Sequence, residues 1–417
     1  MKRIFLIEDT VINKISYYLL VCFLIFLPFR MLYSELALIA LGLHTLVNFK
    51  IKRLRLLLNM HVIAMTSLYL LGLLGILYSP DIKEAINVAG RQLAILLFPV
   101  LLVLNGIDLK KYKSGLLKIF GLTCVATVLY LYADAFYTMH HMHLSFISLF
   151  SPDFMNHNFS LPIQLHATYL SMYVTFAVII FLYLFQKNSN ISLRIFFGIC
   201  IIILLAGMIQ LSSRAALIVL FLIINIIFPL FLLSGKKRVR FIMITTILSV
   251  GTLFSIYNIN SFKSRYVGEL KNDLGIDTMN VEFTEPRVQR WRAEMELIRK
   301  SPLIGYGSGS EKKILKKKFF EERLFISYSL DFNSHNQYLS FWLNMGILGL
   351  AGFLFVLAYS FSFAWKEKDI CFLGFMIIIS VISFSENILF LNKGIFFYSF
   401  FLSLFLFTTN RNVKAVA

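Results

Sequence analysis

The sequence predicts an all-α fold, a polytopic membrane bundle of about twelve transmembrane helices with one large extracytoplasmic helical loop. Apolar residues make up 58% of the chain and charged residues only 15%, which leaves too little polar surface for a soluble domain. The apolar stretches approach the roughly 20 residues that cross a bilayer. They are continuous rather than alternating, so helices rather than a β-barrel are expected.

Twelve apolar stretches are the candidate spans. They cover residues 15–32, 35–49, 60–78, 92–107, 115–138, 165–186, 193–212, 215–233, 240–259, 338–365, 370–389 and 393–409. The chain then divides into residues 1–259 with nine spans, a large loop at 260–338, and residues 339–417 with three spans. The amino-terminal segment is too polar for a cleaved signal, so we expect the first span to remain as an anchor.

Lys and Arg account for the net charge of +18 and concentrate in alternate connections. These basic connections lie near residues 50–55, 110–113, 187–194, 236–240 and 366–368. Short cytoplasmic loops retain Lys and Arg, which predicts cytoplasmic termini and a loop 260–338 on the outer side. A long loop translocates regardless of its own lysines. The four cysteines lie inside apolar stretches without the spacing of a metal site.

Arg214 lies between two apolar stretches that almost touch. A charge there is costly unless it is paired or reaches water. It could be a snorkelling arginine that marks the interface. Because Ser213, Ala215 and Ala216 are small, its guanidinium could equally bind a ligand from the outer side.

A helix is expected from Pro286 to Lys300, because proline suits a first turn and Ser301-Pro302 ends the run. Arg287 would lie at its amino-terminal end, where the helix dipole also favours an anion. Alternatively, Arg287 pairs with Glu285 or Glu294. Val288, Trp291, Met295 and Ile298 recur at helical spacing as the expected buried stripe, whereas Arg290 and Arg292 resemble a solvated face.

Glycines at 305, 307 and 309 permit either a plain turn or backbone amides that converge on an oxyanion. His335 opens the tenth span beside Asn336 and Gln337. Its imidazole can accept a proton from a hydroxyl near neutral pH. The alternative is a structural histidine.

Other polar groups could line the same outer cavity. His166 opens the sixth span, and Arg91 precedes the fourth. His140, His141 and His143 form a group without accompanying carboxylates or thiolates, so a solvated loop is favoured over a metal site. We expect no bound metal and no cofactor.

The ordered motifs resemble the O-antigen ligase and polymerase superfamily. The motifs are Ser213-Arg214-Ala215-Ala216, Arg287 one turn before Trp291, residues 301–307, His335-Asn336-Gln337-Tyr338, and residues 346–350. His166 with Thr168-Tyr169-Leu170 is also similar, although Ala167 stands where proline is frequent. The resemblance covers residues 85 to 365.

The resemblance implies an integral-membrane glycosyltransferase of the bacterial inner membrane. Its donor would be a glycan on a polyprenyl diphosphate carrier, and a ligase would use a lipid A-core acceptor at the periplasmic face. Arg214 and Arg287 would bind the diphosphate, and His335 would activate the acceptor hydroxyl. His166, Arg91, Tyr306, Asn336 and Tyr338 are further candidates for cavity or acceptor contacts.

The residue inventory suits that reaction, because arginine forks can bind phosphate oxygens bidentately without a metal. A base opposite the leaving group favours inversion in one displacement. Alternatives within the superfamily are a polysaccharide polymerase and a protein O-oligosaccharyltransferase. A transporter or flippase is the alternative of another class, although related halves and broken mid-membrane helices are not evident in the sequence.

Overall fold

Every regular element in the described part of the chain is a helix. The structure is a computed structural model that describes residues 6–276 and 285–409. The helices of the bundle are α2 (Val11–Phe26), α3 (Met31–Val47), α4 (Met60–Ile76), α5 (Ile82–Asn105), α6 (Leu109–His141), α8 (Ala167–Lys187), α9 (Ile191–Leu211), α10 (Arg214–Leu222), α12 (Gly235–Asn258), α18 (Gln337–Lys366), α19 (Ile370–Ile382) and α20 (Asn392–Phe407). The predicted all-α fold is confirmed.

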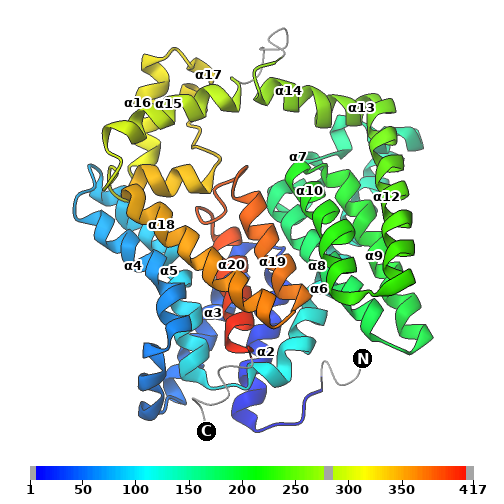
Figure 1. Cartoon of the computed structure of the whole chain (residues 1–417), viewed down its shortest axis with the longest axis horizontal. Coiled ribbons are helices and arrows are strands. Elements are labelled where there is room, and N and C mark those ends of the chain that lie inside the picture. The colour runs from blue at the N-terminus through cyan, green and yellow to red at the C-terminus, as the bar shows by residue number, and fades with distance from the viewer. Residues whose placement is uncertain (1–5, 277–284, 410–417) are drawn as a thin grey trace.

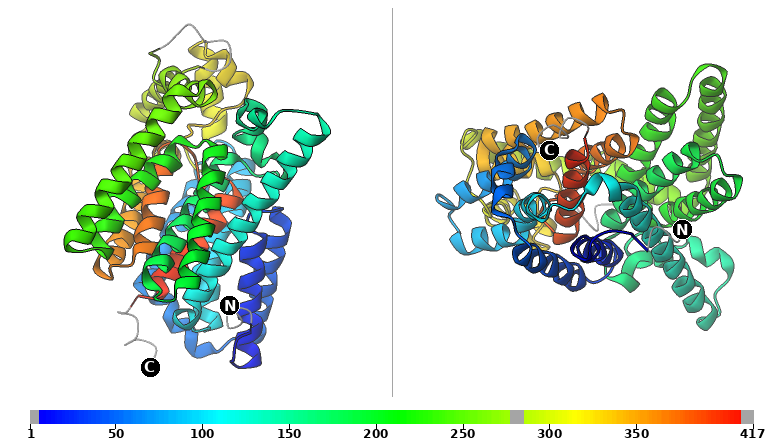
Figure 2. Two further views of the ribbon diagram at one scale, coloured as in Figure 1. Left: turned by 90° about the vertical axis from the view of Figure 1, so that its right-hand side faces the viewer. Right: turned by 90° about the horizontal axis from the view of Figure 1, so that it is seen from below.

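Further α-helices lie between these elements. They are α7 (His157–Ser160), α11 (Phe228–Leu232), α13 (Asn260–Lys263), α14 (Glu269–Asp273), α15 (Arg287–Lys300), α16 (Glu311–Glu321) and α17 (Phe325–Ser329). Figure 1 and the left view of Figure 2 show α15–α17 at one end of the bundle. The described part of the large loop therefore contains helices, as predicted.

Each predicted apolar stretch contributes a helix, but fewer helices have the length and composition of a membrane span. Among the described residues, six helices are long and apolar enough to cross a membrane. The helix pair 51–58 and 60–76, bent by 73°, would make a seventh span. Four shorter apolar helices, α2, α3, α19 and α20, have between 13 and 17 residues. The chain is a multi-pass membrane protein, and the count of twelve spans stays a prediction.

α8 is the central helix of the bundle. Its side chains from Tyr169 to Phe181 are buried, and it packs against α6, α9 and α19. A Cβ on Gly121 of α6 would lie 2.9 Å from the Phe181 ring, and one on Gly374 of α19 would lie 2.8 Å from Ile179. Small residues thus allow these helices the close approach that is common in membrane bundles.

α18 is broken at Gly346, which has φ 62° and ψ −159°. Glycine adopts a positive φ without steric cost, and a Cβ here would lie 2.1 Å from the Leu303 carbonyl oxygen. Residues 337–345 therefore form a short helix at an angle to the rest of α18 (Figure 1). The predicted span over 338–365 is therefore interrupted at Gly346, because the backbone bends where the loop around Leu303 approaches it.

The eleventh predicted span, 370–389, is also wrong in its extent. α19 ends at Ile382, and the residues up to Leu391 form a loop that precedes α20. The Gln337 amide donates to the Ser383 carbonyl at 2.8 Å, which holds this loop against the short helix of α18. The loop enters the centre of the site described below.

The glycine-rich loop 305–309 serves as a packing element. The Tyr306 amide donates to the Leu343 carbonyl at 3.0 Å. The Ser308 amide donates to the Gly75 carbonyl, also at 3.0 Å. Because carbonyls of α18 and α4 occupy these donors, the geometry favours the turn over an oxyanion cradle.

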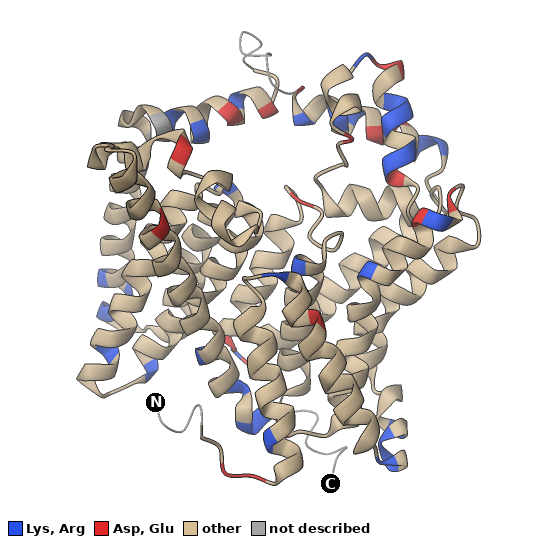
Figure 3. Cartoon of the chain, turned by 180° about the vertical axis from the view of Figure 1, so that it is seen from behind, with Lys and Arg blue, Asp and Glu red and all other residues tan. Residues whose placement is uncertain are grey.

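The basic connections lie at the end of the bundle away from α15–α17. Figure 1 places the links that follow α3, α5, α8, α11 and α18 at that end, and Figure 3 shows Lys and Arg gathered there. A second group of charges of both signs lies on the helices at the opposite end (Figure 3). This distribution is the one expected for basic cytoplasmic links, and the orientation stays a prediction.

Candidate active site

Arg214 is the first residue of α10. α9 ends at Leu211, and Ser212 takes a left-handed φ of 49°, which reverses the chain between the two helices. Arg214 Nη2 donates to Asp273 Oδ2 at 2.5 Å. Its Nη1 is buried and has no hydrogen-bond partner among the described residues. A buried guanidinium donor without a partner is available to a ligand.

Arg287 begins α15, as predicted, and contacts the same carboxylate. Its Nε lies 3.4 Å from Asp273 Oδ1, and its Nη1 donates to the Ser385 carbonyl at 2.9 Å. One carboxylate thus separates two guanidinium groups, which leaves an excess of positive charge. The predicted alternative, a pair between Arg287 and Glu285 or Glu294, is wrong.

Glu285 instead supports α17. Its carboxylate accepts from the Ile326 amide at 2.8 Å and from the Ser327 amide at 2.9 Å. It also accepts from the Ser327 hydroxyl at 2.7 Å. These contacts at the start of a short helix satisfy amides that would otherwise lack partners.

A cavity of about 710 Å³ has the two arginines on its wall. Asp273 and Ser385 complete its polar side, and the remaining lining is mostly aliphatic and aromatic. Leu217, Ile218, Leu270, Val288, Trp291 and Phe384 are among these apolar residues. We call this space the arginine cavity. Its combination of apolar walls and an excess of positive charge suits an amphipathic anion.

His335 pairs with Glu386 from the loop between α19 and α20. His335 Nδ1 lies 3.3 Å from Glu386 Oε2, and the two side chains are 25% and 14% exposed. His335 has a φ of 45°, a strained conformation that its surroundings must hold. Asn333 Oδ1 accepts from the His335 amide at 3.0 Å, and Trp291 Nε1 donates to the Ser334 carbonyl at 2.8 Å.

The charge state of Glu386 determines what His335 can do. Burial is the largest single influence on the pKa of Glu386 and raises it, but the hydrogen bond and charge of His335 and the charges of other neighbours together lower the pKa overall. The charges of His166 and Arg287 act in the same direction. An ionised carboxylate can only accept, so Nδ1 donates and Nε2 of a neutral His335 is left as a proton acceptor.

Glu311, the first residue of α16, joins the parts of the site. It is 5% exposed and accepts from the Ser334 amide at 3.0 Å and from the Ser334 hydroxyl at 2.9 Å. It also accepts from Asn344 Nδ2 at 3.2 Å, from Asn387 Nδ2 at 3.0 Å, and from the Ser340 hydroxyl. One buried carboxylate therefore fixes the residues next to both His335 and Glu386.

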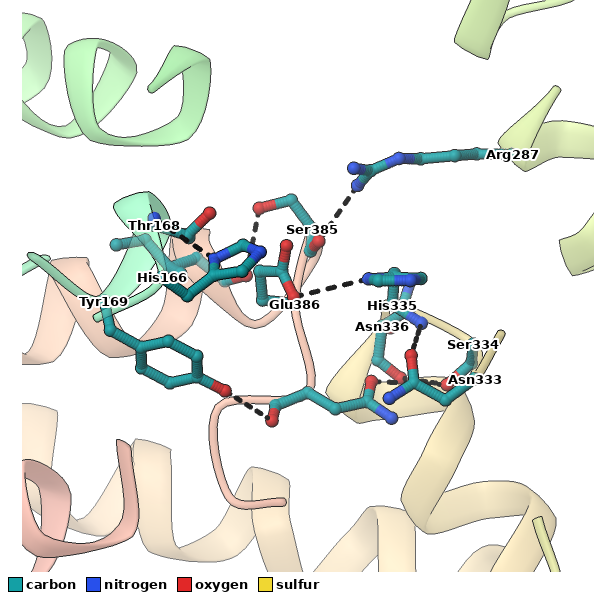
Figure 4. Close-up of polar contacts among 12 residues, drawn as sticks. His166, Thr168, Tyr169, Arg287, Asn333, Ser334, His335, Asn336, Ser385 and Glu386 are labelled. Carbon is teal, nitrogen blue, oxygen red and sulfur yellow. Dashed lines mark hydrogen bonds and ion pairs between the residues drawn. The ribbon is translucent and has the colours of Figure 1, made fainter. Parts of the chain in front are cut away.

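His166 lies on the other side of Glu386 from His335 (Figure 4). It caps α8, because its Nδ1 accepts from the Thr168 amide at 3.4 Å. Its ring centroid lies 4.0 Å from that of His157. Burial, followed by the charge of His166, lowers the pKa of His157 to about 4. Burial also lowers the pKa of His166, although Glu386 opposes that shift.

The buried face of α15 differs from the predicted stripe. Arg290, Ala293, Glu294, Leu297 and Ile298 are its buried residues, so the expectation of a solvated Arg290 is wrong. Of the predicted stripe, Ile298 is buried, whereas Val288, Trp291 and Met295 are only half-buried. Val288 and Trp291 line the arginine cavity.

Arg290 connects α15 to the loop that carries His335. Its guanidinium lies 4.8 Å from the centroid of the Phe332 ring, and that ring contacts the His335 ring edge-on at 5.6 Å. Burial lowers the pKa of Arg290 to about 10, and the charge of Arg287 adds to the shift. Arg290 therefore shares the electrostatic environment of the candidate site.

Three other predicted contact residues have structural partners. Tyr306 donates its hydroxyl to the Leu297 carbonyl at 3.0 Å. Tyr338 donates to the Ser380 carbonyl at 3.0 Å. Asn336 caps α18, since its Oδ1 accepts from the amides of the first turn. These positions hold the fold, whereas the remaining candidate, Arg91, lines a second cavity discussed below.

Asp273, Glu311 and Glu386 are not among the site residues predicted from the sequence. Glu386 had a signal, because it is an acidic residue within an otherwise apolar stretch and such residues are often functional. Asp273 and Glu311 are ordinary acidic residues of a polar loop, and only their partners distinguish them. Within residues 6–276 and 285–409, no group of three or more His, Cys, Asp or Glu residues has a metal-binding arrangement.

Comparison with known proteins finds a similarity in the central region of the chain. Residues 199–354 match the family described as O-antigen ligase, which confirms the resemblance seen in the sequence. Members of this superfamily are membrane glycosyltransferase-like enzymes, ligases and polymerases. The match includes Arg214, Arg287 and His335 but ends before Glu386.

One relative is similar over a larger share of the chain. An uncharacterized protein of Haemophilus influenzae is 29% identical over 243 residues, which cover 54% of this chain. The chain spans 59% of the length of that relative.

Proposed function

We propose that this protein is an O-antigen ligase-like glycosyltransferase. It moves a glycan from a polyprenyl diphosphate carrier to a lipid A-core acceptor at the periplasmic face of the bacterial inner membrane. The main support is that Arg214 and Arg287 share the Asp273 carboxylate on the wall of an otherwise apolar cavity. An isoprenoid chain suits the apolar lining, and a diphosphate suits the guanidinium groups.

The two arginines stabilise the negative charge that develops on the leaving group. When the bond between the anomeric carbon and the diphosphate oxygen breaks, its electron pair stays on the diphosphate. Arg214 and Arg287 stabilise that negative charge in a site with little water. Asp273 holds both side chains while the site is empty and gives way to the stronger anion. We therefore expect turnover without a divalent metal ion.

His335 activates the acceptor. Nε2 takes the proton of the acceptor hydroxyl while the hydroxyl oxygen attacks the anomeric carbon, and the proton later leaves to solvent. Glu386 orients the imidazole through Nδ1 and stabilises the imidazolium. Arg287 donates to Ser385, which immediately precedes Glu386, so the groups that bind the donor and the base are mechanically connected. Attack opposite the leaving diphosphate inverts the anomeric centre.

A polysaccharide polymerase and a protein O-oligosaccharyltransferase would use the same donor chemistry. Deletion of the gene followed by analysis of the surface polysaccharide distinguishes a ligase from a polymerase. Loss of a ligase leaves full-length polymer on the carrier, whereas loss of a polymerase leaves single repeats on the lipid A-core. A glycoprotein gel of the deletion strain identifies a protein O-oligosaccharyltransferase, because only loss of that enzyme would remove a glycan from a protein.

Transport of a lipid-linked substrate is the alternative of another class. The break in α18 at Gly346 is the kind of helix interruption that transporters use. Purified protein in detergent decides between the two, because no compartments exist there. Transfer of glycan from a polyprenyl diphosphate donor to lipid A-core supports the enzyme, and movement in vesicles without transfer in detergent overturns it.

A further inference from the structure

A second cavity, of about 370 Å³, is lined in part by Leu389 and Phe390 of the loop that carries Glu386. We call it the polar cavity. α4, α5, the start of α16 and the short helix of α18 contribute to its wall. Its volume is within the roughly 300–1,000 Å³ of small-molecule sites. Arg91, Gln92, Asn333, Gln337, Asn344 and Phe390 are among its lining residues.

Each cation of the polar cavity is paired with a carboxylate. Arg91 Nη2 lies 2.8 Å from Glu84 Oε1, and Lys312 Nζ lies 3.1 Å from Asp331 Oδ2. Glu311 is occupied by the donors described above. The arginine cavity, by contrast, has two guanidinium groups for one carboxylate. The polar cavity therefore offers no uncompensated cation to a phosphate.

Amide side chains supply hydrogen-bonding groups to the same space. Gln92 Nε2 donates to the Leu389 carbonyl at 3.0 Å, and Gln337 Oε1 accepts from the Leu389 amide at 2.8 Å. The other polar atom of each amide remains for a ligand. Arg91 stacks 4.8 Å above the Phe390 ring, which adds a rigid apolar surface. Paired donors and acceptors beside an aromatic ring suit an uncharged polyhydroxyl molecule.

The two cavities share the segments that carry the candidate base. Ser385 lines the arginine cavity, whereas Leu389 and Phe390 line the polar cavity. Asn333 and Gln337, on either side of His335, also line the polar cavity. The pair His335 and Glu386 thus lies on segments that border both spaces.

We propose that the polar cavity binds an uncharged sugar residue of the acceptor glycan and presents its hydroxyl toward His335. The proposal rests on the transferase function above. It assigns the donor diphosphate and the acceptor sugar to opposite sides of the loop at 383–391. Arg91, Gln92 and Gln337 would then determine which acceptor sugar binds.

The first test fills the cavity without removing a hydrogen bond. Val88 lines the polar cavity, so Val88→Trp should raise the KM for the lipid A-core acceptor at least about tenfold. The KM for the polyprenyl diphosphate donor should change less than about twofold. Ile86→Trp, on the same helix at a residue that is 58% exposed, is the matched control. An unchanged acceptor KM in folded Val88→Trp overturns the proposal.

A binding test does not need turnover. Val88→Cys, in full-length protein with Cys22→Ser, is labelled with a maleimide in detergent. Lipid-free core oligosaccharide should slow labelling, whereas undecaprenyl diphosphate should not. Protection by a repeat-unit oligosaccharide instead would assign the cavity to the donor glycan and overturn the acceptor assignment, and no protection by either sugar would overturn the site. Protection in a protein that transfers no glycan would refute the proposed function alone.

Discussion

His335 Nδ1 lies 3.3 Å from Glu386 Oε2, although 51 residues separate the two in sequence. His335 lies just before the broken helix α18, and Glu386 lies in the loop after α19. The Glu311 carboxylate holds both segments, through Ser334 on one side and Asn387 on the other. The candidate base is thus oriented by a network that involves three separate parts of the chain.

Glu386→Gln should lower kcat about 10- to 1,000-fold, because a neutral amide no longer stabilises the imidazolium that forms on His335. The KM for the donor should change less than about threefold, since Glu386 does not line the arginine cavity. Steady-state kinetics of purified protein measure both. Glu321→Gln, at a surface pair whose carboxylate side is 52% exposed, is the control. A kcat within about twofold of wild type would remove Glu386 from the mechanism.

Arg214→Lys and Arg287→Lys should each reduce transfer about 10- to 100-fold, because an ammonium cannot bind a diphosphate with the planar fork of arginine. Arg299→Lys, an exposed residue of α15, should leave transfer unchanged. The measurement is initial rate at saturating acceptor. Wild-type rates in both variants would contradict diphosphate binding at these residues.

Transfer should persist in excess EDTA, because Arg214 and Arg287 meet the leaving-group charge themselves. The assay compares initial rates before and after chelation, and then after addition of magnesium. Loss of activity that magnesium restores would refute this expectation. A His335→Ala variant should be inactive under every one of these conditions.

Glu294→Gln should stabilise the protein at neutral and alkaline pH. Burial raises the pKa of Glu294 well above its ordinary value. Below about pH 4.5 both folded and unfolded chains carry a protonated Glu294, so it causes no penalty. Above that pH only the unfolded chain ionises, which lowers wild-type stability until the pH reaches the folded pKa.

Thermal unfolding in detergent tests the predicted pH dependence of stability. The Tm of Glu294→Gln should exceed that of wild type by about 2 °C or more at pH 8, and the two should converge near pH 4. Glu321→Gln should follow wild type throughout. A constant difference between Glu294→Gln and wild type at all pH values would show that ionisation is not the cause.

Gly346→Ala should destabilise the fold by at least about 2 kcal/mol, because alanine strains a positive φ and its Cβ would lie 2.1 Å from the Leu303 carbonyl oxygen. Gly251→Ala is the matched control. Its Cβ would meet nothing within 4 Å, so in α12 it should be neutral or stabilising by up to about 1 kcal/mol. Denaturation midpoints compare the two, and equal midpoints would contradict the strained break.

The sequence predicted the features that depend on local pattern. α15 begins at Arg287 and ends at Lys300, as the proline signals at both ends indicated. The helical fold and the family resemblance are confirmed as well. Periodicity failed at Arg290, because that polar residue is buried through a stacking contact with Phe332. It also failed at Gly346, since hydropathy does not register a bend within an apolar run.

By itself, the sequence determined a multi-pass helical membrane protein with arginine and histidine motifs in a fixed order, because composition and helical spacing act over short distances along the chain. The tertiary structure decided which of those residues meet. Asp273 between two arginines, Glu386 beside His335, and Glu311 among its donors are contacts across many residues. They follow from helix packing and the break in α18, and no local pattern encodes them.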